Sequence, residues 1–330
     1  MQMNTDNLNT IFDAAHQALL EENITKFDNL YRQYLWVLKK YRSEIESPAL
    51  TAEKVYEKIL LKRQRGIKPI STGVDWWDTF AGPLRRGNTY VIAGYPGAGK
   101  TTMALNLAWS MAKAGRKVWY YCLELSADEV FEVLAGHIRG KAVLNEQDET
   151  LAYSQVQGTG FRFYEPSGYM PWDKRLEEIC DTVRKENVEV VFIDNLGFLV
   201  RTLKNSYETE QLASARIKGL SQELEIPIVV LHHLRKPEND QTEPEPNAHT
   251  MKGSGAIMAD ASDAFILHHP MDETGRQSRH EVGYLLSGKP RWGMGGKMYV
   301  RLNGSSRTYY QASVTEYPKK SRATRREREF

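Results

Sequence analysis

The sequence is poor in cysteine. Its two cysteines, Cys122 and Cys180, stand far apart and form no C-x-x-C pair. A structural zinc site and a disulfide framework are therefore not expected, and a reducing compartment agrees with this pattern. The chain has no apolar run long enough to cross a membrane. Its first residues lack the basic start and apolar stretch of a signal peptide. We expect a cytoplasmic protein with no membrane partner.

An excess of charge of one sign is also lacking. The formal net charge is +2 over 330 residues, which is too small to indicate a nucleic-acid partner by itself. The length allows one large domain with a smaller piece, and we find no internal repeat. Only local clusters of charged residues can therefore indicate a nucleic-acid partner.

The chain does contain a glycine-rich turn between an apolar run and a helical segment, with the spacing G-x-x-x-x-G-K-T of a phosphate loop. Glycine lets backbone N–H groups approach phosphate oxygens, and the following helix points its positive end at them. Lys100 would reach the β- and γ-phosphates, and Thr101 would bind Mg²⁺. The alternative is a chance match in some other strand-turn-helix. We predict that ATP or another NTP binds at Gly94, Tyr95, Pro96, Gly97, Ala98, Gly99, Lys100, Thr101 and Thr102.

Further apolar runs predict the strands of a mainly parallel α/β sheet, at 89–93, 117–123 and 188–194. Glu124 follows the second of these strands, where open α/β sheets place their ligand groups. Asp194 ends the third strand, as expected for the carboxylate that holds Mg²⁺ or its water. Glu124 could instead be a solvated acid at a strand end.

Four regions follow from the patterns. Residues 1–50 read as a small helical hairpin, which is either a collar for a partner or a cap on the main core. A linker helix over 51–69 either packs on a neighbouring subunit or is a plain linker. The nucleotide domain spans 70–315, and it includes a loop over 237–249 that we expect to be mobile. A basic tail covers 316–330.

The motifs also occur in a particular order: the phosphate loop, Leu123-Glu124, Phe192-Ile193-Asp194-Asn195, His233-Leu234-Arg235-Lys236, Gly253-Ser254-Gly255-Ala256 and Lys289-x-Arg291. As an ordered set they resemble the RecA-like motor domain of hexameric replicative helicases of the DnaB class. The resemblance is strongest to the helicase half of phage primase–helicases and to the mitochondrial helicase Twinkle. It covers roughly residues 66–311. It implies a RecA-like P-loop NTPase core, with a twisted sheet flanked by helices, after a small helical region.

The resemblance also implies roles for single residues. Glu124 would activate the attacking water, and His233 would sense the γ-phosphate. Lys289 and Arg291 would reach into the neighbouring subunit's site, with Arg291 as the arginine finger. His233 could instead be satisfied at the sheet edge, and Arg291 could serve a local salt bridge.

The single-stranded DNA backbone would be held by a loop flanked by Arg235, Lys236, Lys252 and Gly253, although Arg235 and Lys236 could simply be solvated. Because the stretch 238–245 within this loop is acidic, we expect only the residues on either side of it to bind the DNA backbone. Nothing in the chain resembles a primase, and the basic tail places polymerase docking through it in doubt.

The resemblance therefore predicts an ATP-dependent replicative DNA helicase or translocase that forms a ring, expected to be hexameric, on single-stranded DNA. A primase, a polymerase or a loader would be further partners. A phage or plasmid origin would place the protein in the bacterial host cytoplasm. Two alternatives stay open: a recombination ATPase of the RadA type and a regulatory ATPase scaffold of the KaiC type.

Overall fold

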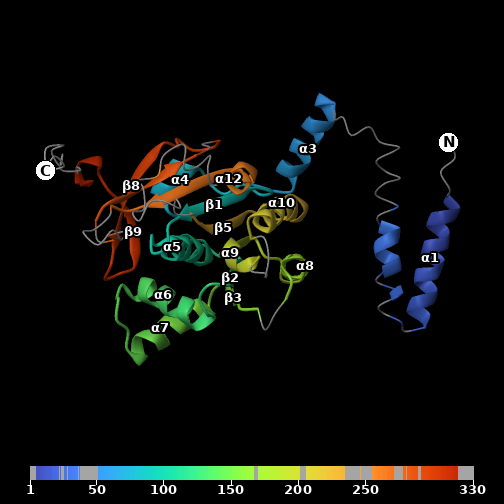
Figure 1. Cartoon of the computed structure of the whole chain (residues 1–330), viewed down its shortest axis with the longest axis horizontal. Coiled ribbons are helices and arrows are strands. Elements are labelled where there is room, and N and C mark those ends of the chain that lie inside the picture. The colour runs from blue at the N-terminus through green and yellow to red at the C-terminus, as the bar shows by residue number, and fades with distance from the viewer. Residues whose placement is uncertain are drawn as a thin grey trace, which may run out of the picture. The chain divides into compact units, whose positions relative to one another are not determined.

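A computed structural model of the chain forms two compact units, Met1–Ile67 and Lys68–Phe330 (Figure 1). The structure describes residues 5–21, 23, 26–27, 29–35, 37, 51–166, 170–200, 206–234, 246, 255–270, 278–279, 281–288 and 291–318. Within these residues, no helix combines the length and the apolar character needed to span a bilayer.

The first unit begins with helix α1 (Thr5–Leu20). Ala15 and Ala18 of this helix are buried. The Phe12 ring lies 5.7 Å from the ring of Tyr34, which belongs to a second helical segment over 29–35. Two helical segments therefore contact each other in this unit, and the hairpin over 1–50 stays a prediction.

Helix α3 (Ala52–Gln64) follows in the same unit. Its first turn is capped by Thr51, whose hydroxyl accepts a hydrogen bond from the Lys54 N–H at 3.3 Å. None of its residues is buried, and Tyr56 and Ile59 are among the large apolar side chains that it exposes.

The second unit is built on one sheet, which has nine strands in the described part of the chain, in the order β3-β2-β4-β5-β1-β6-β7-β8-β9. Neighbours from β3 to β6 pair in parallel, and those from β6 to β9 pair antiparallel. The strands are β1 (Thr89–Gly94), β2 (Val118–Cys122), β3 (Phe161–Tyr164), β4 (Val190–Asp194), β5 (Ile228–His233), β6 (Asp263–His268), β7 (Gly283–Ser287), β8 (Lys297–Asn303) and β9 (Thr308–Gln311).

Helices cover both faces of this sheet (Figure 1). They are α4 (Asp75–Ala81), α5 (Lys100–Lys113), α6 (Ala127–Arg139), α7 (Glu146–Gln157), α8 (Trp172–Glu186), α9 (Leu196–Leu199), α10 (Ser206–Leu224) and α12 (Gly255–Asp260), with a short 3₁₀ turn, η1, at Val314–Glu316.

The strand β1 shows how the core is divided between the two faces. Tyr90 and Ile92 point into the cluster under α4, α5 and α6, whereas Val91 and Ala93 point into the cluster under α8, α9, α10 and α12. Successive side chains of a strand alternate between faces, so a strand covered on both faces must be apolar throughout. This is why the run before the phosphate loop shows no polar alternation.

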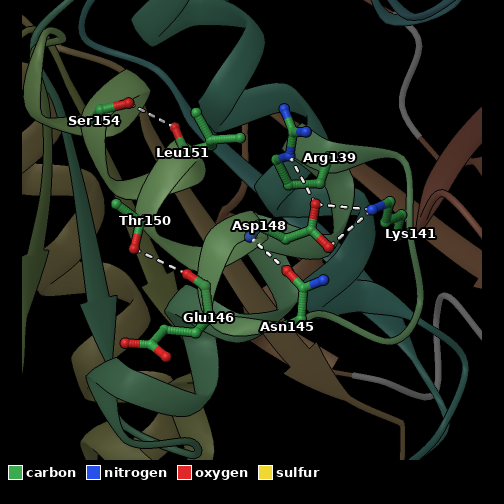
Figure 2. A network of polar contacts seen from close by, with 8 residues as sticks. All are labelled: Arg139, Lys141, Asn145, Glu146, Asp148, Thr150, Leu151 and Ser154. Carbon is green, nitrogen blue, oxygen red and sulfur yellow. Dashed lines mark hydrogen bonds and ion pairs between the residues drawn. The ribbon is translucent and has the colours of Figure 1, made fainter.

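A polar network joins α6 to α7 (Figure 2). The buried Asp148 carboxylate accepts hydrogen bonds from Lys141 Nζ at 2.9 Å and from Arg139 Nε at 3.3 Å. The Asn145 side chain caps α7 by accepting from the Asp148 N–H at 2.9 Å. The network fixes the turn between the two helices and so the orientation of α6, which borders the site described below.

The sequence patterns did not predict α4, α7 or α9. The apolar run over 226–231 ends at Leu231. In the structure β5 continues through His232 to His233, because this strand pairs with β1 as far as the register Gly94↔His233.

Candidate nucleotide-binding and hydrolysis site

Four parallel strands end at the same edge of the sheet, and the predicted site residues follow from their ends. In the register, Gly94 of β1 lies opposite His233 of β5, and Cys122 of β2 lies opposite Asp194 of β4. Glu124 comes two residues after Cys122, and its backbone N–H donates to the Asp194 carbonyl at 3.1 Å. Topology therefore brings together Gly94 and His233, which are 139 positions apart in the sequence (233 − 94).

The phosphate loop leaves β1 at Gly94 and enters α5 at Lys100. Gly97 and Gly99 have φ values of 79° and 89°, a region that favours glycine. The Met103 N–H donates to the Gly99 carbonyl at 2.9 Å and closes the first turn of the helix. A side chain at Gly94 would meet the Leu267 carbonyl. The loop thus has the backbone shape and the helix N-terminus of an anion cradle.

The buried Lys100 ammonium group is held inside this cradle. Its Nζ donates to the Tyr95 carbonyl at 3.0 Å and lies 3.2 Å from His233 Nδ1. His233 Nε2 in turn lies 3.0 Å from Glu124 Oε2. A ring with its proton on Nε2 and a lone pair on Nδ1 satisfies both contacts. His233 therefore connects the cation of the phosphate loop to the candidate base.

Glu124 has a second partner that the sequence patterns did not single out. Asn195 Nδ2 donates to Glu124 Oε2, while Asn195 Oδ1 caps α9 by accepting from the Phe198 N–H at 3.2 Å. The hydrogen bond from His233 is the largest cause that lowers the pKa of Glu124, and burial opposes it. Both donors contact the same oxygen, so Oε1 keeps its capacity to accept from a water.

Asp194 is almost fully buried next to two hydroxyl groups. Its Oδ2 accepts from the Tyr120 hydroxyl at 2.8 Å, and its Oδ1 makes no hydrogen bond within the described residues. Burial raises the pKa of Asp194, and the hydroxyls of Tyr120 and Thr101 oppose that rise. A free carboxylate oxygen beside a hydroxyl is an oxygen-donor set that suits Mg²⁺.

The floor of the phosphate loop is supported from β9. The buried Tyr309 hydroxyl lies 3.2 Å from both the Ala98 carbonyl oxygen and His269 Nε2. Burial lowers the pKa of His269 to about 4, so the ring is neutral at physiological pH, and its Nδ1 donates to the Glu281 carbonyl at 3.1 Å. A Cβ at Gly99 would collide with the Tyr309 hydroxyl. This glycine is therefore needed for support as well as for its φ angle.

A cavity of about 190 Å³ opens beside these groups. Its polar lining includes Lys100, Thr101, Glu124 and His233, all expected to act at the site. Its lining also includes Arg279, which no motif indicated.

Arg291 lies elsewhere. Its backbone N–H donates to Asp263 Oδ1 at 3.3 Å, and Asp263 pairs with Tyr90, near the start of β1. The phosphate loop begins after Gly94 at the other end of that strand, about 13 Å away at ~3.3 Å per residue. The structure therefore does not bring Arg291 to the phosphate loop of its own chain.

The remaining candidates cannot be placed. Lys289, Arg235, Lys236, Lys252 and Gly253 lie outside the described residues, as do most of the expected mobile loop at 237–249 and residues 319–330 of the basic tail.

The family model for the DnaB-like helicase C terminal domain matches residues 69–311, most of the chain. The chain belongs to this family. The match covers the strands, the phosphate loop and the strand-end residues described above, so the resemblance read from the ordered motifs is confirmed.

Two curated relatives carry replicative helicase names. "Replicative DNA helicase DnaB" of Treponema pallidum (strain Nichols) is 28% identical over 273 residues, which cover 79% of this chain and 58% of that protein. "Probable plasmid replicative DNA helicase" of Chlamydia trachomatis serovar L2 is 29% identical over 189 residues, which cover 54% of this chain and 42% of that protein. The chain thus spans about half the length of these relatives.

A solved structure titled "The Structure Of A DnaB-Like Replicative Helicase And Its Interactions With Primase" has the same fold as this chain. The two chains match with a TM-score of 0.68 at 19% identity, over 92% of this chain and 76% of the solved one. This likeness confirms the RecA-like core that the DnaB-family motifs implied.

Four contributors to the site escaped the sequence patterns: Arg279 in the cavity lining, Asn195, Tyr120 and Tyr309. Asn195 stands in the quoted motif over 192–195 without a role, because its contact with Glu124 depends on the pairing of β2 with β4. Tyr120 looked like one more aromatic residue of a buried strand. Tyr309 lies more than 200 residues beyond the loop it supports, and no spacing rule connects the two.

Proposed function

We propose that this chain is an ATP-hydrolysing motor that moves along single-stranded DNA as a replicative helicase. The observation that carries the proposal is the continuous contact from Lys100 through His233 to Glu124 at the rim of the cavity. A cation for the phosphates and a carboxylate for the attacking water are the two groups that phosphoryl transfer to water requires. Both occur here in one hydrogen-bonded chain.

Each residue has a defined task in this proposal. The phosphate-loop N–H groups and Lys100 bind the triphosphate, and Glu124 orients the attacking water through Oε1. Because the pKa of Glu124 is lowered, the carboxylate is ionised at neutral pH and available to accept a hydrogen bond from that water. Thr101 and Asp194 would hold Mg²⁺, which would supply positive charge to neutralise the phosphates.

His233 has a sensing role in this scheme. Its ring contacts both Lys100 and Glu124, so a γ-phosphate that recruits Lys100 changes the hydrogen bonds of His233. The chain leaves β5 directly after His233 and continues toward Arg235 and Lys236, which we propose hold the DNA backbone together with Lys252 and Gly253. Contacts to phosphates give a grip that does not depend on base sequence.

A second subunit completes the site. The backbone of Arg291 lies near the opposite end of strand β1 from its own phosphate loop, so we assign Arg291, together with Lys289, to the site of a neighbouring copy. Helix α3 buries none of its side chains and offers an apolar stripe for packing on such a copy. The assembly is a homo-oligomeric ring, six copies being the expected number, with the DNA in its channel.

Because two relatives carry replicative helicase names, we propose that the chain acts at a replication fork, with a primase, a polymerase or a loader as partners. The bacterial cytoplasm, including that of a phage or plasmid host, is the compartment in which such a fork is found.

The test measures ATP hydrolysis with and without single-stranded DNA, together with particle size and shape by electron microscopy. We expect DNA to stimulate hydrolysis and ring-shaped particles to form. If rings form but single-stranded DNA does not change the rate of ATP hydrolysis, the motor function is contradicted and a regulatory ATPase is favoured. Filaments that exchange strands without unwinding would favour a recombination ATPase.

A further inference from the structure

We propose that Arg85 and Trp292 are positioning residues that set the arginine finger, Arg291, in the geometry that it needs to serve the neighbouring subunit. This inference rests on the proposed function, because it concerns how the finger of one chain is presented to the site of another. Neither residue lies in the phosphate-loop cavity of its own chain.

The segment that follows Arg291 is fastened to helix α4 by its backbone. The Met294 N–H donates to the Thr79 carbonyl at 3.3 Å, and the Gly295 N–H donates to the Phe80 carbonyl at 3.0 Å. Gly293 lies so close to the backbone of Phe80 and Ala81 that any Cβ there would collide with it. The segment therefore has little freedom to move away from α4.

Helix α4 is itself fixed to the core of the sheet. Trp77 and Phe80 are buried, and their rings lie 5.1 Å and 5.8 Å from the ring of Phe265 on β6. On its other side, Arg291 is tied to β6 by the hydrogen bond from its backbone N–H to the buried Asp263 carboxylate. The backbone of the finger residue is thus held between two rigid elements.

With the backbone held, only the side chains of this segment can still rotate, and Arg85 contacts one of them, Trp292. The guanidinium carbon of Arg85 lies 3.6 Å from the centroid of the Trp292 ring, which is a close cation–π contact. The backbone of Arg85 is anchored, because its N–H donates to the Tyr90 hydroxyl at 2.7 Å and the preceding Leu84 pairs with Ile70. Trp292 is 48% exposed even with this contact, so an anchored arginine over one face of the indole restricts a side chain that has few other neighbours.

Trp292 directly follows the finger, so its orientation limits the directions open to Arg291. A fixed cation is useful only if it already points to the place where charge develops. If the indole could rotate freely, Arg291 would have to be ordered again in each catalytic cycle. We therefore expect the stack to contribute to kcat and to have little effect on nucleotide binding.

The experiment compares the steady-state ATPase of Trp292→Ala, Trp292→Phe and Arg85→Ala in the full chain. Met294→Ala is the matched control, since this residue lies on the same segment and is 72% exposed. A misplacement of about 1 Å can cost roughly 100-fold, so we expect Trp292→Ala and Arg85→Ala to lower kcat by about 10- to 100-fold. The KM for ATP should stay within about twofold. Trp292→Phe, which keeps an aromatic face, should recover most of the rate, and Met294→Ala should match the unmodified protein.

Mixing experiments then identify the subunit in which the defect acts. Subunits that carry Glu124→Gln have inactive sites and intact fingers, so mixtures of them with Arg85→Ala subunits should regain activity. Mixtures of Glu124→Gln with Lys100→Ala should stay inactive. A normal rate for Arg85→Ala, or a loss that no mixture restores, would overturn the positioning role. If Arg291→Ala itself is active or is not rescued, the failure lies instead in the proposed subunit-shared site.

Discussion

Removing the imidazole of His233 tests how the candidate base is tuned. In His233→Ala, Glu124 loses the hydrogen bond that contributes most to lowering its pKa, and it keeps the smaller contribution from Asn195. The pKa of Glu124 should therefore rise, and a larger fraction of the carboxyl group should be protonated in mildly acidic solution. His233→Gln is the conservative variant, because an amide can donate to Glu124 and accept from Lys100.

The size of the effect follows from the kind of contact that is lost. A hydrogen bond to a charged group contributes about 1.5–3 kcal/mol. The Glu124 side chain is 32% exposed, so solvent screens part of this, and we take the low end. About 1.5 kcal/mol corresponds to roughly a tenfold loss of kcat/KM on the acid limb of the pH profile. For Asn195→Ala the change should be smaller, because Asn195 is the weakest of the causes that act on this group.

The assay is the pH dependence of kcat/KM for ATP hydrolysis, which reports ionisations of the free enzyme. The unmodified protein should keep its rate well into the acid range, because its base stays ionised there. The acid limb should move to higher pH most in His233→Ala, less in Asn195→Ala and least in His233→Gln. The comparison includes the unmodified protein and the variants His233→Ala, Asn195→Ala and His233→Gln. If all four bind nucleotide and their acid limbs coincide, His233 does not tune the pKa of Glu124.

Three further predictions concern other parts of the chain. Lys100→Ala should abolish ATP hydrolysis, and normal turnover would reject the phosphate-loop assignment. Tyr120→Phe removes a donor to a buried carboxylate; it should raise the Mg²⁺ concentration needed for half-maximal binding of a fluorescent ADP by about 3- to 10-fold, and an unchanged titration would exclude Tyr120 from the metal site. Asp148→Asn should lower Tm at pH 7, because the Lys141 hydrogen bond lowers the pKa of Asp148 in the folded state. That stability is present above the unfolded pKa and is lost as pH falls through the folded value, so the Tm gap should close in strong acid, and a gap that persists there would contradict this account.

The parts of the fold that the sequence predicted well are those with a strong local cause. The phosphate loop needs glycines at fixed offsets, and Gly97 and Gly99 have the positive φ values that explain them. The buried strands need continuous apolar runs, and β1, β2, β4 and β6 lie where such runs occur. Local chemistry was sufficient to find these elements.

The parts that it missed depend on pairing between distant residues. Helix α7 has a polar exterior with few buried side chains, so apolar periodicity could not reveal it. The role of the buried Asp148 depends on its hydrogen bonds with Arg139 and Lys141, which only the structure shows. The end of β5 does not follow from the apolar run, because histidine is a weak strand signal, whereas the pairing of β5 with β1 settles the boundary. Arg279 and Tyr309 reach the site through the antiparallel extension of the sheet, whose register no local pattern specifies.

The phosphate loop and the backbone of Arg291 lie near opposite ends of strand β1, which gives the protomer a polarity. If the finger of one copy completes the pocket of the next, the contact is head-to-tail and cannot form a twofold-symmetric dimer. An open row of such copies always has one pocket at one end without a finger and one finger at the other end without a pocket. Closing the row is then the step that makes every pocket competent, so catalytic output per chain should increase when the last gap in the circle is filled.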